Sequence, residues 1–362
     1  MSDSSASPEA TASPADHTPE RVLVTGGGGF LGQYVVEQLI ARGDEVHSLS
    51  RKAYPELDAL GVQQHQADLT NRRAVINACE GMQAIHHIAA IAGIGGSWNT
   101  YYSINTLGSQ NILAGCLQHG VDKLIYASSP SVTFAGEDQE GIDETTPYPE
   151  TWLAHYPHSK AMGEEVLLKA NGSYHAKDRP LWTCALRPHL IWGPRDQHLF
   201  PRLLERARSG RLRQIGDGKN LIDTVYVENA AAAHLLASDR LYEGSPVCGS
   251  AYYITQAEPV PCWKWINTLL AVANEPPIKK KISAKAAYRL GACFEKVYGL
   301  LGIQKEPPMT RFLAAQLSTA HYYDPTKARE ELGYIPAIST EEGLARFKQW
   351  VSENAPEQVA AS

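Results

Sequence analysis

A run of glycines between an apolar segment and an amphipathic one limits what this chain can fold into more than any other feature. Arg21–Thr25 is a short apolar run, typical of a buried strand, and it stops at Gly26. An amphipathic pattern follows the glycines and predicts a helix. Glycine permits a tight turn and close backbone approach, and a helix N-terminus offers free N–H groups to a pyrophosphate. A merely flexible turn is the alternative, but it would leave the stability cost of the glycines uncompensated. We therefore predict dinucleotide binding at Gly26, Gly29, Phe30, Leu31 and Gly32.

Strands and helices alternate through the first half of the chain. Further predicted strands are 45–50, a weaker one ending at Asp68, 84–88, 123–128 and 182–187. This alternation predicts an α/β protein with a doubly wound parallel sheet, the Rossmann fold. Beyond about residue 190 the alternation becomes looser, which predicts a smaller mixed C-terminal lobe that binds the substrate.

The domain boundaries follow from this change of pattern. Residues 20–190 are predicted to form the dinucleotide-binding domain, to which 223–240 returns as a strand and a helix. Residues 191–222 and 241–350 are predicted to form the substrate-binding lobe.

The end of the second predicted strand bears on which dinucleotide is bound. Sites that prefer NAD usually place Asp or Glu there, to bind the ribose 2′-hydroxyl. This chain has Ser50 instead, followed by Arg51 and Lys52, so a 2′-phosphate would be accommodated. We predict NADP(H), with NAD(H) as the alternative because exposed cations are often simply solvated. Further residues predicted to line the cofactor are Asp68, Leu69, Ala89 and Ala90.

Tyr156 and Lys160 are four positions apart, which places them on one helix face. An ammonium group near a phenol favours the phenolate, so Lys160 is expected to lower the pKa of Tyr156 below its usual value of about 10. Ser129 follows a predicted strand, at the edge where open parallel sheets bind ligands. Alone, the Tyr-x-x-x-Lys spacing is weak evidence, because it arises by chance in many helices. With the glycine turn, it predicts proton transfer at a bound substrate.

Composition excludes several other classes of protein. The net charge of −6 argues against nucleic-acid binding. The six cysteines include no C-x-x-C pair, which favours a reducing compartment, and no metal site is predicted. We predict a cytoplasmic protein without a membrane-spanning segment. Residues 1–19 are rich in Ser, Ala, Pro and acids and are predicted to be a disordered tail, and residues 351–362 a flexible one.

Taken together, the motifs resemble the extended short-chain dehydrogenase/reductase family. The resemblance rests on TGGGGFLG (25–32), ADL (67–69), LIYASSPSV (124–132), YPHSK (156–160) and LRPHLIWGP (186–194). IGDGKNLIDTVYVENAAAAH (215–234) is similar to the 3β-hydroxysteroid dehydrogenase branch of that family. LRPHLIWGP, SPSV and TRFL (310–313) resemble bacterial 2-alkyl-3-oxoalkanoate reductases of olefin biosynthesis most closely.

This resemblance implies a role for each matching residue. Tyr156 would be the general acid/base, with Lys160 assisting it and holding the nicotinamide ribose, and Ser129 would orient the substrate oxygen. Asn105 matches the family's helix asparagine and would be a catalytic residue with Ser129, Tyr156 and Lys160. Pro188 matches the loop beside the nicotinamide. The implied reaction interconverts a ketone and a secondary alcohol on a bulky hydrophobic substrate, such as a 2-alkyl-3-oxoalkanoate or a 3β-hydroxysteroid.

Some alternatives stay open at this point. A sugar-nucleotide epimerase or dehydratase would use the same residues with a tightly bound NAD. The predicted helix at 284–301 is basic and partly apolar, a pattern that fits either a core-facing helix or peripheral contact with a membrane. The resemblance also implies a homodimer formed by the helices at 101–119 and 159–170.

Overall fold

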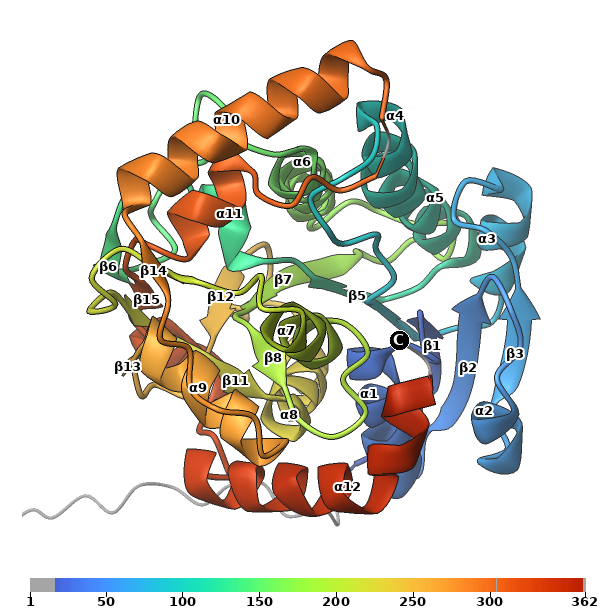
Figure 1. Cartoon of the computed structure of the whole chain (residues 1–362). Coiled ribbons are helices and arrows are strands. Elements are labelled where there is room, and N and C mark those ends of the chain that lie inside the picture. Colours follow the sequence, from blue (N-terminus) through green and yellow to red (C-terminus); the bar gives the residue numbers. More distant parts are fainter. Residues whose placement is uncertain (1–16, 304, 361–362) are drawn as a thin grey trace, which may run out of the picture.

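The computed structural model describes residues 17–303 and 305–360, with side chains up to residue 354, and a seven-stranded sheet runs through its centre (Figure 1). The strand order is β12-β7-β5-β4-β1-β2-β3, and every neighbouring pair is parallel. Its strands are β1 (Arg21–Thr25), β2 (Glu45–Ser50), β3 (Gln63–Gln66), β4 (Ala84–His87), β5 (Lys123–Ala127), β7 (Trp182–Pro188) and β12 (Ala251–Ile254). The predicted doubly wound parallel sheet is confirmed.

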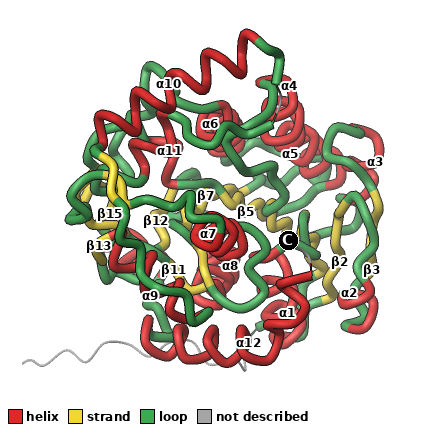
Figure 2. The backbone as a smooth tube through the Cα atoms, in the orientation of Figure 1, coloured by secondary structure: helices red, strands yellow, loops and turns green. Residues whose placement is uncertain are grey.

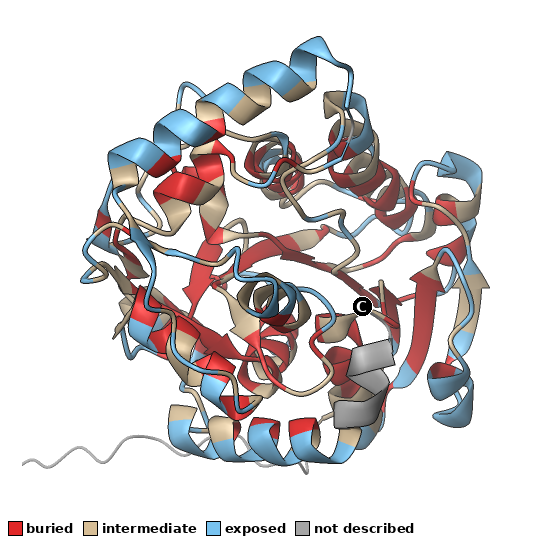
Figure 3. Ribbon diagram, viewed as in Figure 1, coloured by how far each residue is buried: buried red, intermediate tan, exposed pale blue. Residues whose placement is uncertain are grey.

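Helices cover both faces of this sheet, because its strands are apolar on both sides. Val22 and Val24 of β1 pack into one core cluster, and Leu23 between them packs into another. The first cluster lies under α1 (Phe30–Arg42) and α8 (Val227–Asp239), which pack against each other. The second lies under α3 (Arg72–Ala78), α5 (Gly108–His119) and α6 (His155–Lys169). Figure 2 shows the strands between these two sets of helices, and Figure 3 shows how fully the central strands are buried.

A smaller lobe is built mainly from residues after 190. Its sheet has the order β13-β10-β15-β6, and two further pairs of short strands are β11 with β8 and β14 with β9. A third core cluster, which includes Trp192 and Trp265, holds this lobe together. The strands are β6 (Gln139–Ile142), β8 (Ile191–Trp192), β9 (Gln214–Ile215), β10 (Leu221–Ile222), β11 (Val225–Tyr226), β13 (Val260–Pro261), β14 (Lys281–Ile282) and β15 (His321–Tyr323). The helices are α7 (Leu199–Arg208), α9 (Cys262–Val272), α10 (Ala284–Leu300), α11 (Arg311–Gln316) and α12 (Thr340–Ala360). The π-helix η4 (Ala328–Leu332) packs instead into the first core cluster, beside α8 and β12.

The structure differs from the sequence-based prediction at several points. β12 belongs to the large sheet, although its residues fall in the segment assigned to the substrate-binding lobe. Helix α12 continues to Ala360, and Val351 is buried, where a flexible tail was expected from residue 351. The single helix expected over 101–119 is three consecutive elements, α4 (Trp98–Tyr101), the π-helix η2 (Tyr102–Leu107) and α5. The remaining short elements are α2 (Pro55–Ala59) and η3 (Pro130–Thr133).

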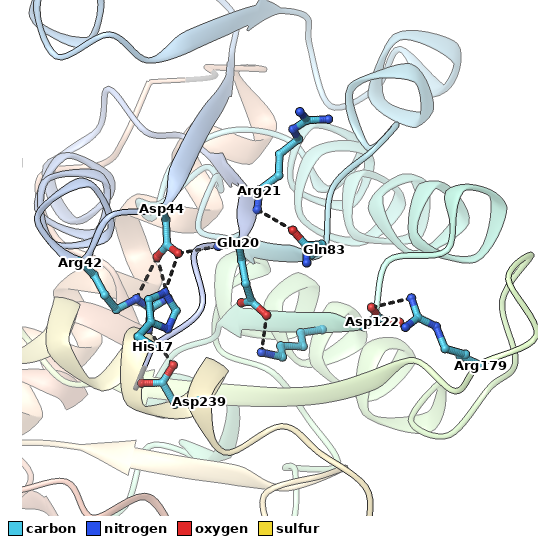
Figure 4. Close-up of polar contacts among 10 residues, drawn as sticks. His17, Glu20, Arg21, Arg42, Asp44, Gln83, Asp122, Arg179 and Asp239 are labelled. Atoms are coloured by element: carbon cyan, nitrogen blue, oxygen red, sulfur yellow. Dashed lines mark hydrogen bonds and ion pairs between the residues drawn. The ribbon is translucent and has the colours of Figure 1, made fainter. Parts of the chain in front are cut away.

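Polar contacts attach the segment before β1 to the amino-terminal edge of the sheet (Figure 4). His17 Nε2 lies 2.7 Å from the buried carboxylate of Asp44, and Glu20 pairs with Lys123 at 2.7 Å. The predicted disordered tail at 1–19 falls mostly on residues 1–16, which lie outside the described residues.

Every helix within 17–303 and 305–360 is too short or too polar to cross a bilayer.

Candidate active site

The glycine turn joins β1 to α1 in a very narrow space. Gly26 has a φ of +72°, which favours glycine, and its N–H donates to the Leu49 carbonyl at 2.8 Å. A side chain at Gly32 would place its Cβ only 2.1 Å from the Gly26 carbonyl oxygen. Within the described residues no side chain caps the start of α1, so the first N–H groups of the helix, at Phe30 and Leu31, are available to an anion. The turn therefore fits the pyrophosphate of a dinucleotide.

Small residues lie side by side where β1 and β4 end, next to the glycine turn. A Cβ at Gly26 would meet the Cα of Ala89 at 3.1 Å, and the Ala89 N–H donates to Thr25 Oγ1 at 3.0 Å. Ala90, next along the chain, is exposed. This edge of the sheet can accept a flat ligand against its backbone.

The end of β2 carries no acidic residue. The Ser50 hydroxyl is buried and has no hydrogen-bond partner among the described residues, and Arg51 beside it is exposed. Lys52 Nζ lies 5.0 Å from the centre of the Tyr54 ring. Hydrogen bonds from Thr70 lower the pKa of Asp68, and the charge of Arg51 adds to that shift. The Ser50 hydroxyl and the Arg51 side chain thus lie at the strand end where Rossmann folds recognise the ribose.

The side chain of Leu69 faces the core, so the predicted contact with the cofactor would involve its backbone N–H. Its side chain is buried in the core cluster beneath α5, where a Cβ at Gly108 would lie 2.9 Å away. Its carbonyl accepts a hydrogen bond from Asn111 Nδ2 at 2.8 Å. The side chain of Leu69 therefore packs in the core, because α5 covers this strand end.

Tyr156 lies in the first turn of α6, close to Ser129 at the end of β5. Withdrawal of its hydroxyl from water raises the pKa of Tyr156, and a hydrogen bond with Ser129 acts in the opposite direction. Ser129 Oγ also lies 2.8 Å from Ser131 Oγ. Ser129 is partly exposed, whereas its neighbour Ser128 is buried. This makes Ser129 the serine of the pair that a substrate can reach.

Lys160 is directed at the backbone of the neighbouring strand. Its Nζ donates to the Ala127 carbonyl at 2.6 Å and lies 4.0 Å from the centre of the Tyr126 ring. Burial lowers the pKa of Lys160 to about 7, and the charge of Glu164 opposes that shift. The expectation that Lys160 lowers the pKa of Tyr156 is wrong for this structure, because burial outweighs the other influences on the phenol.

Asn105 uses its side chain to hold the site together. It lies in the π-helix η2, where its Nδ2 donates to Ile91 O and Ser159 Oγ, both at 3.0 Å. Its Oδ1 accepts from the Ile91 N–H at 2.8 Å. Asn105 thus fastens the loop after β4 to helix α6. Pro188, at the end of β7, is half-buried and lies opposite Ile254 of β12.

A buried ion pair beneath the site was not predicted. Arg187 donates to Glu164 through Nε at 3.1 Å and Nη2 at 2.5 Å, and both side chains are almost fully buried. The Tyr148 hydroxyl donates to the same carboxylate at 2.7 Å. The sequence does indicate that Glu164 lies near the site, since it is one helical turn after Lys160. It does not indicate the partner of Glu164, because Arg187 is on a strand distant in sequence.

Comparisons with known proteins agree with this geometry. A family model described as the 3-beta hydroxysteroid dehydrogenase/isomerase family matches residues 23–282. A 2-alkyl-3-oxoalkanoate reductase of Stenotrophomonas maltophilia is 47% identical over 91% of this chain and 98% of its own length. A sterol-4-alpha-carboxylate 3-dehydrogenase (decarboxylating) of Mus musculus is 33% identical over 91% of this chain and 90% of its own length.

Among solved structures, the UDP-glucose 4-epimerase of Thermus thermophilus in complex with NAD is 26% identical, with a TM-score of 0.68. That match covers 92% of this chain and 99% of the epimerase chain. The named relatives are oxidoreductases, and the resemblance inferred from the sequence motifs is confirmed. This chain belongs to the 3-beta hydroxysteroid dehydrogenase/isomerase family.

Proposed function

We propose that this protein is an NADP(H)-preferring reductase that interconverts the 3-oxo and 3-hydroxy forms of a 2-alkylalkanoic acid. The observation that carries the proposal is the placement of Tyr156 and Ser129 at the same edge of the sheet as the glycine turn. The 47% identity to a 2-alkyl-3-oxoalkanoate reductase supports the choice of substrate over a steroid. A nicotinamide cofactor fits the narrow turn at Gly26 and Gly32.

The chain's own residues supply proton transfer and orientation. The nicotinamide, when bound, provides the hydride for reduction of the substrate carbonyl. Ser129 donates a hydrogen bond to the substrate oxygen and stabilises the negative charge that develops there. Tyr156 donates its proton to that oxygen, and its raised pKa keeps it protonated before the reaction. Lys160, whose pKa is about 7, can carry a proton at the bottom of the site.

The function is tested with purified protein by following NADPH and NADH at 340 nm. We expect NADPH oxidation with a 2-alkyl-3-oxoalkanoic acid and little turnover of a 3-oxosteroid. Turnover of the steroid with NADH alone would contradict both the substrate and the cofactor proposal. Co-purified NAD without net redox turnover of either substrate would favour the chemistry of a sugar-nucleotide epimerase.

The cofactor preference is tested by replacing Arg51. A charge-assisted contact with a phosphate is worth roughly 1.5–3 kcal/mol, so Arg51→Ala should raise the KM for NADPH about 10- to 100-fold. The KM for NADH should stay unchanged. Arg179→Ala is a matched control, because Arg179 pairs with Asp122 at the amino-terminal edge of the sheet (Figure 4). An equal effect of Arg51→Ala on both cofactors would rule out recognition of the 2′-phosphate.

We also propose a cytoplasmic homodimer that touches membranes peripherally. All six cysteines, each within the described residues, are free thiols, including the exposed Cys293, as is usual in a reducing compartment. Leu290, Val297 and Leu300 of helix α10 are exposed, and Figure 3 shows exposed positions along most of this helix. The proposed dimer contact on α5 and α6 would cover the exposed Leu107 beside them. Light scattering tests the dimer, and the mass of a monomer would contradict it. Co-sedimentation with anionic vesicles tests the membrane contact, and protein left in the supernatant would contradict that proposal.

A further inference from the structure

Two arginines on α7 share one carboxylate in a way that leaves positive charge in excess. Arg202 and Arg206 are one helical turn apart, and each pairs with the same oxygen of Glu306, Arg206 at 3.4 Å. Burial lowers the pKa of Arg206, and the charges of Arg202 and Arg211 lower it further, against the opposing effect of Glu306 and Glu205. One acidic side chain therefore compensates two guanidinium groups, which have donors left for a second anion.

This cluster is connected to the catalytic tyrosine through a short chain of contacts. The backbone of Glu306 lies directly on the loop after β4, since a Cβ at Gly95 would be 2.6 Å from Glu306 Cα. The Gly95 carbonyl accepts a hydrogen bond from the Tyr101 hydroxyl at 2.8 Å. The Tyr101 ring in turn lies 6.3 Å from that of His155, the residue before Tyr156.

The same groups influence the Tyr101 hydroxyl. Burial raises the pKa of Tyr101 to about 12, with additional contributions from Glu306 and Tyr156 and an opposing one from Arg202. The buried Tyr101 therefore lies between the Glu306 cluster and the segment that carries Tyr156.

We propose that Arg202, supported by Arg206, binds the carboxylate of the substrate and that Glu306 is the internal counter-ion which this carboxylate replaces. The inference rests on the proposed function and specifies how its substrate is selected. In a 3-oxo acid the carboxylate is two bonds from the carbon that is reduced, so its counter-ion must face the same space as Tyr156. Planar guanidinium groups suit a carboxylate because they can donate two parallel hydrogen bonds. The names of both relatives described above also specify a carboxylate.

Segment 305–310 allows the Glu306 carboxylate to be replaced by the carboxylate of the substrate. Glu306 is on this irregular stretch between α10 and α11, and its side chain is 24% exposed, so its carboxylate can leave without disturbing a core. Arg202 is itself 45% exposed, and its replacement should not affect folding. The exchange involves no covalent step, since one carboxylate takes the place of another.

The test compares a 2-alkyl-3-oxoalkanoic acid with its methyl ester as substrates. Arg202→Gln should raise the KM for the acid about 10- to 100-fold and leave the KM for the ester and the kcat for both substrates unchanged. Glu306→Gln should lower the KM for the acid, because it removes the competing carboxylate. Arg208→Gln is the matched control: Arg208 is on the same helix, is equally exposed and pairs with Glu275. Equal effects of Arg202→Gln on acid and ester would overturn the proposal.

A binding measurement separates this inference from the proposed function. Calorimetric titration with an unreactive 2-alkylalkanoic acid, compared with its primary amide, needs no turnover. Tighter binding of the acid to the native protein, lost in Arg202→Gln, would support the carboxylate site even if the oxo acid were not reduced. Equal binding of the acid and the amide to the native protein would overturn the site, even if the oxo acid were reduced.

Discussion

Tyr156→Phe should reduce kcat for ketone reduction by at least about 10²- to 10⁴-fold, because a positioned proton donor contributes a factor of that size. The phenylalanine ring fills the same space in the first turn of α6, so the KM for substrate and cofactor should change little. Tyr156 as a residue is half-buried, and the variant removes only its hydroxyl and the hydrogen bond with Ser129, so the fold should be little affected. Steady-state rates at saturating substrate and cofactor are the measurement.

Tyr102→Phe is a suitable control for this experiment. Tyr102 is also partly exposed, and its ring packs against Trp98 in the neighbouring helical segment rather than beside Ser129. We expect it to keep the native rate. If Tyr156→Phe also kept a near-native rate with an unchanged thermal midpoint, another group would have to supply the proton, and the assignment of Tyr156 would be wrong.

Glu164→Ala should destabilise the protein by about 3–5 kcal/mol, which is the usual cost of leaving one member of a buried ion pair without its partner. The Arg187 guanidinium would remain buried near β12, with its centre 5.2 Å from the centre of the Tyr253 ring and without a carboxylate to neutralise it. Urea denaturation, followed by the tryptophan signal, measures the change in the free energy of unfolding. Activity should also fall, because Glu164 is on the helix that carries Tyr156 and Lys160.

Glu165→Ala provides the comparison on the adjacent residue. Glu165 pairs with Lys169 on the surface, an arrangement worth less than about 0.5 kcal/mol.

The double variant Glu164→Leu with Arg187→Met should recover much of the stability, since apolar residues often replace a buried pair at little cost. A Glu164→Ala variant no less stable than Glu165→Ala would show that the buried pair contributes nothing.

The sequence predicted the elements whose pattern is local. The apolar run before Gly26 and the amphipathic segment after it appear as β1 and α1. The spacing of Tyr156 and Lys160 likewise places both on α6. These features depend on neighbours a few residues apart, so periodicity and glycine positions suffice to predict them.

Features that depend on distant partners could not be predicted in this way. Whether burial or a nearby cation controls the pKa of Tyr156 depends on what encloses the hydroxyl. The core position of Leu69 depends on α5 packing over it. The pairing of Glu306 with α7 joins residues about a hundred positions apart, and no local pattern indicates it.

The position of β12 matters for how the chain emerges from the ribosome. It covers one side of β7, yet 62 residues separate Pro188 from Ala251. At about 5 to 20 residues per second, translation of that stretch takes roughly several seconds. During this time β7, an apolar strand, presents an open edge of the kind that promotes aggregation. Chains released at residue 250 should therefore bind more chaperone in a cell-free translation than chains released at residue 300, and equal capture would contradict this view.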